Sequence, residues 1–511
     1  MSFPTAINNE AMECIRDLFP EHKMHPKTVE DVLNQSSFLS KIRAYEEVHS
    51  QAFDAMPSEL QDALILPRLQ QIVNTLMVNP LWKERLREHG VTSHPASFEE
   101  WQHLPITDRD TLHHFYMGKR SGQVVPLSEG GFEVVASGGT SGGLPIETVY
   151  SVRELRDTYL LAGNHMDKYI FQHHFPSGLP RWVIMTLADN DMWSSGTMIG
   201  GVLQWATKTN FIAAGPMSEM VYKHILSFEG NKAIMGMSRE IEPLVELGAD
   251  VPLEDRNSFK LAIYGSGLLQ SRKVAELKAT YPHLQILSYF ASNQAEAIGM
   301  QHDPGDYLIA VPGLHFIEIV DDEGRWVKEG EEGELVITRL HASEAPVLRM
   351  QLGDRMIRRP NKVTPGLNAL QMEFAGRSSD IIHIGETHYP AAKVLSCLHQ
   401  VFGDNGLNID ARAVETQFLN DRVNRNLTLF AATKDADALD ARIHQLFPET
   451  AIRSMFLEAL KQSLPLYDQN PYHFTALDRV AYTFDIRIVP PASPHIYRTK
   501  VNKIPLIKDL V

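Results

Sequence analysis

A glycine-rich stretch with three hydroxyl side chains stands about a quarter of the way along the chain. Residues 136–145 read ASGGTSGGLP, so Ser137, Thr140 and Ser141 lie among four glycines. Glycines let the backbone adopt left-handed conformations and approach a ligand closely, and successive N–H groups in such a turn form a concavity for anions. The stretch predicts a phosphate-binding loop, although a flexible surface loop has the same composition.

Two well-known phosphate loops do not fit this stretch. The loop of P-loop nucleotide triphosphatases ends in Gly-Lys-Ser or Gly-Lys-Thr, whereas this stretch ends in Gly-Gly-Leu-Pro. A dinucleotide-binding loop opens directly into a helix, and Pro145 followed by the extended segment IETVYS argues against a helix here. The sequence therefore favours a phosphate loop of another kind.

The segments that must position this loop alternate between short apolar runs and helical patterns. RWVIMTLA precedes VYKHILSF, NKAIMGM precedes IEPLVELG, and FKLAIYGSG precedes SRKVAELKATY. This order predicts a largely parallel sheet covered by helices. Over residues 305–338 the pattern becomes hairpin-like, with a turn at 321–324 and a further strand in GELVITRL.

The pattern changes at two places along the chain. Residues 1–100 read mainly helical, with apolar residues three or four positions apart. Beyond residue 375, ARAVETQFL and NLTLFAAT predict paired strands around the polar turn NDRVNRN. We therefore expect a helical N-terminal region at 1–100, a core at 101–375 and a small domain at 376–511.

Composition excludes several classes of protein. The chain has 511 residues and a formal net charge of −15, which argues against a general affinity for nucleic acid or anionic membranes. Two cysteines cannot form a disulfide framework and suit a reducing compartment. The N-terminus lacks the order of a signal peptide, and no run reaches the length of a membrane span. We expect a cytoplasmic protein.

Histidines are frequent, but their spacing predicts no metal site. The 22 histidines include the adjacent pairs His113–His114 and His173–His174. No His-Glu-x-x-His pattern occurs.

Five segments together resemble the adenylate-forming enzymes, the superfamily of acyl-CoA synthetases, luciferases and peptide-synthetase adenylation domains. ASGGTSGGLP is similar to their phosphate loop, and HLPITDRDTL at 103–112 is similar to a segment of phenylacetate-CoA ligase relatives. APVLRMQLGD at 345–354, FAGRSSDIIHIGETHYPAAKV at 374–394 and SPHIYRTKVNKIPLIKDL near the C-terminus resemble three further motifs. The segments come in the family's order, from about residue 100 onward.

The resemblance implies a fold and a two-step reaction. The fold is α/β, with a large adenylation domain of mixed sheets covered by helices, whose AMP-binding core is 101–375. A small α+β lid domain at 376–511 would rotate about the hinge residue Ser379. The enzyme would join a carboxylic acid to the α-phosphate of ATP with Mg²⁺, release pyrophosphate, and pass the acyl group to a thiol, most simply CoA. The phenylacetate-CoA ligase relatives suggest an aromatic acid.

The resemblance also assigns roles to particular residues. Asp354 would hold the ribose hydroxyls of ATP or AMP, Arg377 would add a ribose or phosphate contact, and Glu296 would lie near Mg²⁺ and the α-phosphate. Tyr289 or Phe290 would stack on the adenine. The residues that would surround the phosphates and the adenine are Ser137, Gly138, Gly139, Thr140, Ser141, Gly142, Gly265, Ser266 and Gly267.

The chain departs from the family pattern at three places. Ala295 stands where a hydroxyl residue usually precedes the glutamate, so that phosphate contact is missing. Gly143 and Leu144 stand where a loop lysine is common. Lys503 in VNKIP aligns best with the family's catalytic lysine, but Lys500 is an alternative.

Simpler interpretations stay open beside these assignments. Asp354 also suits a turn after Gly353, and Arg377 also suits an exposed position on the surface. The glycines at 264–267 also suit the end of a buried strand, and the C-terminal lysines also suit a solvated tail. The acyl acceptor can also be an amine or a carrier protein, and a catalytically quiet relative that only binds nucleotide is a further alternative. Residues 1–100 would form a homodimer contact or cap the acyl pocket.

Overall fold

We describe a computed structural model of the chain. It describes residues 9–136, 146–189, 192, 194–206, 208–265, 269, 271–377, 380–384, 387–464, 482–498 and 504–510. The chain forms two compact units. The C-terminal unit contains Ala375–Val511 with the short segment Leu269–Glu276, and the large unit contains the other described residues.

The first part of the large unit is helical. Between Asn9 and Trp101 the described residues form helices and no strand. These are α1 (Asn9–Leu18), α2 (Glu21–Met24), α3 (Val29–Leu33), α4 (Phe38–His49), η1 (Phe53–Ala55), α5 (Ser58–Leu76), α6 (Pro80–Glu88) and α7 (Phe98–Trp101). Buried Arg68 on α5 donates hydrogen bonds to the carbonyl oxygens of Leu340 and Ala342, which ties this region to the sheet that follows.

An eleven-stranded sheet forms the centre of the large unit, with strand order β10-β11-β12-β13-β9-β8-β7-β6-β5-β3-β4. The strands are β3 (Arg181–Met185), β4 (Asn210–Ala213), β5 (Asn231–Met237), β6 (Phe259–Gly265), β7 (Gln285–Ser292), β8 (Glu296–Met300), β9 (Leu308–Ala310), β10 (His315–Val320), β11 (Glu332–Arg339), β12 (Met350–Thr364) and β13 (Leu367–Arg377). Strands β4, β3, β5, β6 and β7 are parallel, as the alternating pattern predicted. All seven residues of β5 are buried, as expected for a strand covered on both faces.

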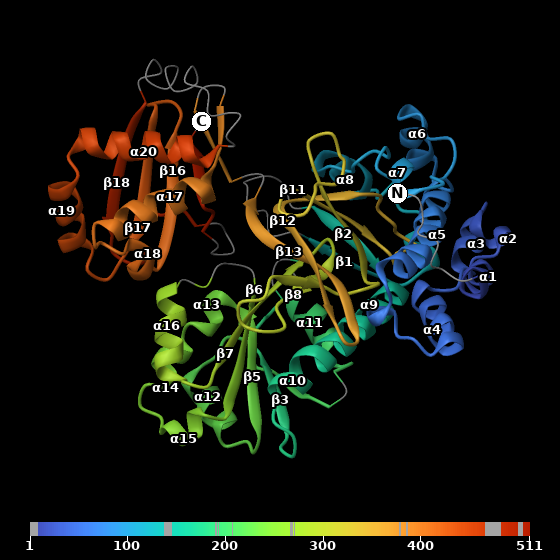
Figure 1. Cartoon of the computed structure of the whole chain (residues 1–511), viewed down its shortest axis with the longest axis horizontal. Coiled ribbons are helices and arrows are strands. Elements are labelled where there is room, and N and C mark those ends of the chain that lie inside the picture. Colours follow the sequence, from blue (N-terminus) through green and yellow to red (C-terminus); the bar gives the residue numbers. More distant parts are fainter. Residues whose placement is uncertain are drawn as a thin grey trace. The chain divides into compact units, whose positions relative to one another are not determined.

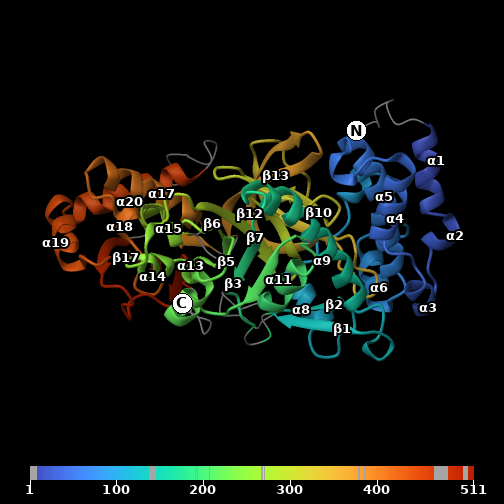
Figure 2. The same ribbon diagram turned by 90° about the horizontal axis from the view of Figure 1, so that it is seen from below.

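Helices cover both faces of the parallel strands (Figures 1 and 2). In both views α9 and α11 lie on one side of β3 and β5, and α13, α14 and α15 lie on the other. The helices between residues 109 and 280 are α8 (Arg109–Tyr116), η2 (Leu127–Glu129), α9 (Val152–Met166), the π-helical turn η3 (Asp167–Phe171), α10 (Gln172–His174), α11 (Ser195–Leu203), α12 (Glu219–Leu226), α13 (Ser238–Ile241), α14 (Leu244–Gly248), α15 (Leu253–Arg256) and α16 (Ser271–Thr280).

The antiparallel part of the sheet confirms the predicted hairpin pattern. Strand β10 pairs with β11 over six residue pairs, and the N–H of Gly324 donates to the carbonyl of Asp321 in the turn beyond β10. A separate hairpin joins β1 (Phe132–Ala136) to β2 (Glu147–Ser151). Its strands flank the glycine stretch, which itself lies outside the described residues.

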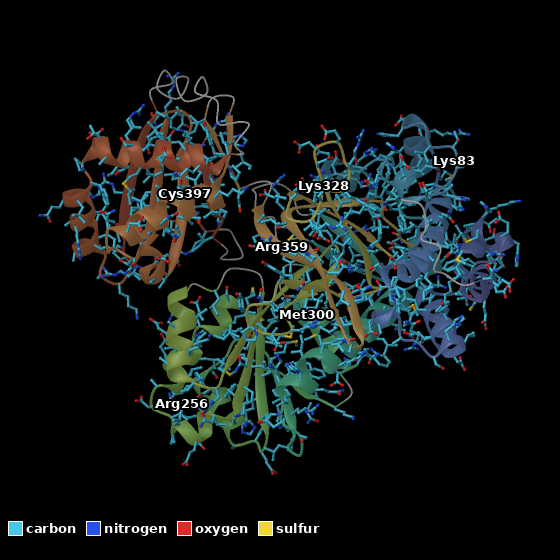
Figure 3. The ribbon with its side chains drawn as sticks, viewed as in Figure 1. Lys83, Arg256, Met300, Lys328, Arg359 and Cys397 are labelled. Atoms are coloured by element: carbon cyan, nitrogen blue, oxygen red, sulfur yellow. The ribbon has the colours of Figure 1, made fainter. Side chains whose placement is uncertain are left out.

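The C-terminal unit contains a four-stranded sheet with order β18-β17-β16-β19 and a two-stranded sheet. Its elements are β14 (Ile381–Ile384), β15 (Thr387–Pro390), α17 (Ala391–Asp404), α18 (Ile409–Arg412), β16 (Glu415–Asp421), β17 (Asn426–Ala432), α19 (Ala436–Leu446), α20 (Glu449–Ser463), β18 (Thr483–Val489) and β19 (Ile507–Leu510). The predicted pair is confirmed, because β16 and β17 are antiparallel neighbours. Cys397 lies half-buried on α17 (Figure 3), and both cysteines are free thiols.

The described helices were compared with the length and apolarity that a membrane crossing requires. No helix among them is both long enough and apolar enough to span a bilayer.

Candidate functional site

The two ends of the glycine stretch are held together by the hairpin of β1 and β2. Ala136, the last described residue before the stretch, is the register partner of Glu147, just beyond it. Residues Ser137, Gly138, Gly139, Thr140, Ser141 and Gly142, predicted to clasp phosphates, lie outside the described residues. The hairpin nevertheless fixes where their segment leaves and re-enters the fold.

A second turn is attached to the same hairpin. The residues between β7 and β8 include Asn293, whose buried side-chain amide donates a hydrogen bond of 2.6 Å to the carbonyl of Ala136. The hydroxyl of Tyr150 on β2 donates to the carbonyl of Asn293 at 2.8 Å. The start of the glycine stretch and the β7–β8 turn therefore form one hydrogen-bonded assembly.

This turn positions Glu296, the first residue of β8. Glu296 has a φ of 50°, in the left-handed region, and its side chain is buried. A positive φ is uncommon outside glycine and persists only where the surrounding structure enforces it. The Oε1 atom of Glu296 has no hydrogen-bond partner among the described residues.

Other charged groups surround the Glu296 carboxyl. Burial raises the pKa of Glu296 well above its usual range, and the nearby carboxyl of Glu154 on α9 acts in the same direction. The hydroxyl of Thr158 and the guanidinium of Arg339 oppose this rise. Burial also raises the pKa of Glu154, against the attraction of Arg339. Two buried carboxyls thus share one cation, which favours a bound proton at neutral pH.

Arg339, the last residue of β11, connects these groups. Its Nη1 lies 3.3 Å from Oε1 of Glu154, and its Nη2 donates to the carbonyl of Ala345 at 2.7 Å. Its guanidinium carbon lies 4.3 Å from the ring centre of Tyr150. Sequence reasoning missed both Arg339 and Glu154. The available signal was an arginine inside the otherwise apolar strand GELVITRL, since a buried arginine needs a carboxylate partner.

The predicted adenine-binding residues meet at the carboxyl end of β6. An added Cβ on Gly265 would lie 2.6 Å from the ring of Tyr289, so the two residues are in direct contact. Tyr289 is buried in the core between the sheet and α9. Phe290 is half-buried and packs against Phe374 with ring centres 5.8 Å apart. Ser266 and Gly267 lie outside the described residues.

Asp354 and Arg377 lie on neighbouring strands of the sheet. Asp354 is buried within β12 rather than placed in a turn after Gly353. Arg377 is the last residue of β13 and is half-buried. Its carbonyl accepts a hydrogen bond from the N–H of Asp380 at 2.9 Å. The hinge candidate Ser379 lies outside the described residues.

The two lysine candidates, Lys500 and Lys503, also lie outside the described residues, but both flanks of their segment are fixed. Buried Gln417 on β16 accepts a hydrogen bond from the N–H of Tyr497 at 2.8 Å. Its amide nitrogen donates to the carbonyls of Tyr497 and Pro505 at 3.1 and 3.0 Å. One side chain therefore spans the segment that carries the lysines.

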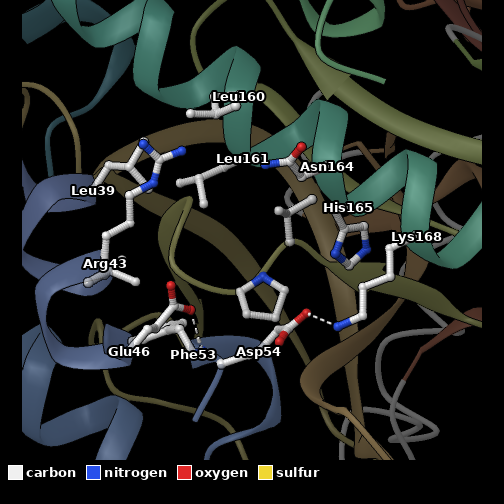
Figure 4. Close-up of a pocket in the computed structure, with 14 residues that line it drawn as sticks. Leu39, Arg43, Glu46, Phe53, Asp54, Leu160, Leu161, Asn164, His165 and Lys168 are labelled. Atoms are coloured by element: carbon white, nitrogen blue, oxygen red, sulfur yellow. Dashed lines mark hydrogen bonds and ion pairs between the residues drawn. The ribbon is translucent and has the colours of Figure 1, made fainter. Parts of the chain in front are cut away.

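A separate pocket lies between the N-terminal helices and α9 (Figure 4). It encloses about 190 Å³ and is lined by residues of α4 and η1 and by Leu160, Leu161 and His165 of α9. Ligand pockets typically have volumes of about 300–1,000 Å³, so this pocket is small for a nucleotide. None of the predicted site residues lines it.

Comparisons with known proteins identify the fold. The chain matches no model of a known protein family and no curated protein sequence. It is similar to the solved structure of 2-hydroxyisobutyryl-CoA ligase in the postadenylation state in complex with 2-HIB-AMP, at 17% identity and a TM-score of 0.61, over 90% of this chain and 91% of that chain. The open conformation of that ligase, in complex with 2-HIB-AMP and CoA, matches at 17% identity and a TM-score of 0.58, over 90% and 93%.

The likeness extends over nearly the whole length of both chains. It confirms the mixed α/β architecture with a smaller C-terminal part that the sequence motifs predicted. At this identity, the likeness shows the fold rather than the substrate. The chain has the fold of 2-hydroxyisobutyryl-CoA ligase.

Proposed function

We propose that this chain activates a carboxylic acid with ATP, forming an acyl-adenylate and pyrophosphate, and then transfers the acyl group to CoA. The observation that carries the proposal is the bond between Asn293 and Ala136. It joins the start of a glycine and hydroxyl stretch suited to phosphates to the turn that presents a buried carboxylate, on a fold shared with a CoA ligase.

The residues that the motifs assign to the site suit the first step. The amides and hydroxyls of residues 137–142 would donate to the β- and γ-phosphates of ATP, where negative charge must be neutralised. Asp354 would accept hydrogen bonds from the ribose diol, and Arg377 would contact ribose or phosphate. Gly265 and one of the aromatic rings, Tyr289 or Phe290, would flank the adenine. Phe290 is the better candidate, because Tyr289 is held in the core.

Glu296 fits the role of a magnesium ligand. Mg²⁺ prefers carboxylate oxygens, and Oε1 of Glu296 is buried and has no hydrogen-bond partner among the described residues. A bound Mg²⁺ would neutralise phosphate charge. Because the pKa of Glu296 is raised, its carboxyl must lose a proton when the cation binds. Lys503 or Lys500 would bring a further positive charge to the reacting carboxylate.

The proposal also concerns the class of carboxylic acid and the acceptor of the acyl group. We propose an aromatic acid on the strength of the motifs shared with phenylacetate-CoA ligase relatives. The solved relative is named for 2-hydroxyisobutyryl-CoA, so small hydroxy acids belong in the same screen. An amine or a carrier protein remains the alternative acceptor.

The test is acid-dependent pyrophosphate release with ATP and Mg²⁺. A panel of aromatic and small hydroxy acids should contain at least one that raises the rate above the acid-free background. Glu296→Gln should reduce that rate by about 100-fold. The matched control is Glu323→Gln, which alters an exposed glutamate in a turn and should leave the rate unchanged. No release with any acid, together with no ATP binding by calorimetry, would overturn the proposal.

The acceptor is identified by the mass of the product. With an acid that passes the first test, mass spectrometry should detect an acyl-CoA thioester. If an amide or a loaded carrier protein forms in place of the thioester, that acceptor replaces CoA in the proposal. The proposed adenylation step is unchanged by this result.

One observation favours a second candidate function, in which the protein binds nucleotide without catalysing a reaction. Glu154 and Glu296 share a single buried arginine, so a proton on Glu296 would weaken Mg²⁺ binding. A protein that binds ATP without turnover would fit a regulatory nucleotide-binding role. Calorimetric ATP binding, combined with no pyrophosphate release from pH 6 to 9, would favour this candidate over the enzyme.

A further inference from the structure

We propose that His173, His174 and Asp303 form a binding site for a divalent transition-metal ion of the Zn²⁺ type. In the part of the chain that the structure describes, this is the one group of three potential metal ligands whose donor atoms lie within 4.8 Å of one another. The inference is independent of the proposed function, because none of these residues belongs to the nucleotide-binding machinery described above.

The site joins two segments that are far apart in the sequence. His173 and His174 end the helical run of α9, η3 and α10. Asp303 follows β8, whose last residue is Met300 (Figure 3). The histidine pair lies on α10, which follows the π-helical turn η3. Such turns are rare and are found frequently at functional sites.

The distances suit a small cation. Nε2 of His173 lies 3.1 Å from Oδ1 of Asp303, and Nε2 of His174 lies 3.7 Å from the same oxygen. With metal–ligand bonds of about 2.0–2.2 Å in a tetrahedral site, donor atoms are about 3.3 Å apart. The two nitrogen–oxygen distances lie on either side of that value, and all three donor atoms lie within 4.8 Å of one another, so the side chains must close around the ion.

Burial divides the three side chains into an anchor and two adjustable ligands. The side chain of His174 is 8% exposed, whereas those of His173 and Asp303 are 56% and 50% exposed. The two exposed side chains can therefore close around the ion, and water can reach the remaining coordination position. The two imidazole rings are already close, with centres 4.7 Å apart and planes at 79°.

Two neighbouring interactions bear on this group of ligands. Lys362 pairs with the neighbouring Asp306 at 2.8 Å. Nε2 of His174 lies 2.5 Å from the carbonyl oxygen of His302, and its proton is shared with that oxygen. An ion about 2.0 Å from Nε2 in this direction would overlap the carbonyl oxygen, so the His174 ring must give up this hydrogen bond and turn for Nε2 to bind a cation.

A buried histidine pair holds the backbone next to Asp303. Nε2 of His302 lies 2.9 Å from Nε2 of His165, and the His302 ring stacks on Tyr169 with ring planes 6° apart. Outer groups that orient metal ligands in this way strengthen binding. Two imidazoles and one carboxylate favour Zn²⁺ over Mg²⁺ or Ca²⁺, which prefer oxygen ligands alone. The ion would link the end of the α9 run to the β8–β9 loop.

The experiment uses the full chain after removal of metals with a chelator. Calorimetric titration with ZnCl₂ should show one site, and Co²⁺ should give the visible absorption of a tetrahedral nitrogen and oxygen site. Asp303→Asn changes an exposed carboxylate and should weaken Zn²⁺ binding about tenfold or more. His173→Gln should have a similar effect. His174→Gln should abolish the cobalt absorption.

The matched control is the double variant His113→Gln, His114→Gln. It removes the other adjacent histidine pair, on α8, and should bind Zn²⁺ as the unaltered chain does. Thermal unfolding without metal should be the same for Asp303→Asn and the unaltered chain, whereas a given concentration of Zn²⁺ should raise the midpoint less in the variant. Equal Zn²⁺ affinity of the unaltered chain and Asp303→Asn, or no saturable site, would overturn the proposal.

Discussion

The side-chain amide of Asn293 donates a hydrogen bond to the carbonyl of Ala136, with 2.6 Å between the nitrogen and the oxygen. Ala136 is the last described residue before the glycine stretch, and Asn293 lies three residues before Glu296. A single hydrogen bond therefore couples the position of the proposed phosphate loop to that of the proposed magnesium ligand.

Asn293→Asp should separate these two parts of the site. A carboxylate cannot donate to the Ala136 carbonyl, so the buried acceptor loses its partner at a cost of about 1–3 kcal/mol. We expect KM for ATP to rise about tenfold in pyrophosphate-release assays. Asn405→Asp removes a comparable amide-to-carbonyl bond from an exposed residue just after α17 and should leave KM unchanged. An unchanged KM in Asn293→Asp would show that the coupling has no role in ATP binding.

Arg339→Met should strongly destabilise the large unit. The variant leaves the buried carboxyl of Glu154 without its ion-pair partner and removes the contact with the Tyr150 ring. Breaking a buried ion pair on one side costs about 3–5 kcal/mol. Urea denaturation should measure this loss. Adding Glu154→Leu should recover part of the loss, because no unpaired charge then remains. A full additive loss in the double variant would contradict a direct pairing.

Gly265→Ala should disturb the proposed adenine site through Tyr289. The new Cβ would lie 2.6 Å from the Tyr289 ring, so the ring or the strand must move. Overpacking of this kind costs about 1–3 kcal/mol, and ATP affinity should fall with it. The control Gly403→Ala adds a Cβ on α17 whose nearest neighbour would be 3.9 Å away. It should not lower stability. Combining Gly265→Ala with Tyr289→Leu should relieve the strain.

Gln417→Leu should affect catalysis through the lysine segment. The variant removes three hydrogen bonds that hold Tyr497 and Pro505 on either side of residues 499–503. We expect kcat of adenylation to fall about tenfold while KM for ATP changes little, because a mispositioned lysine weakens the transition state selectively. A loss of stability without any change in kcat would instead make Gln417 a purely structural residue.

Stability should fall in acid because of buried His341. Burial lowers the pKa of His341 to about 4, and the charge of Arg68 acts in the same direction. The unfolded chain therefore binds the proton more readily, and stability is lost as pH falls from about 6.5 through 4. His341→Gln keeps a donor for the Gly313 carbonyl and should reduce the loss between pH 7 and 4 by about 3 kcal/mol. Equal acid sensitivity of both proteins in urea titrations would exclude His341 as the cause.

Local pattern was enough to predict much of the fold. The alternation of apolar runs and helical segments predicted the parallel strands β3, β5 and β6, because strand and helix periodicities are properties of neighbouring residues. The same holds for the pair β16 and β17 and for the turn after β10. The ordered motifs predicted an α/β fold with a small C-terminal domain, and the likeness to 2-hydroxyisobutyryl-CoA ligase confirms this architecture.

The tertiary structure alone decided which distant residues share a site. Glu154, Arg339 and Glu296 come from a helix and two strands, and no spacing in the sequence relates them. The sequence predicted no metal site at His173 and His174, because their carboxylate partner Asp303 lies 129 residues further along. Electrostatic and coordination contacts depend on distance in space, which chain order does not encode beyond the nearest neighbours. The sequence determined the elements and the motifs, and packing decided which charges meet.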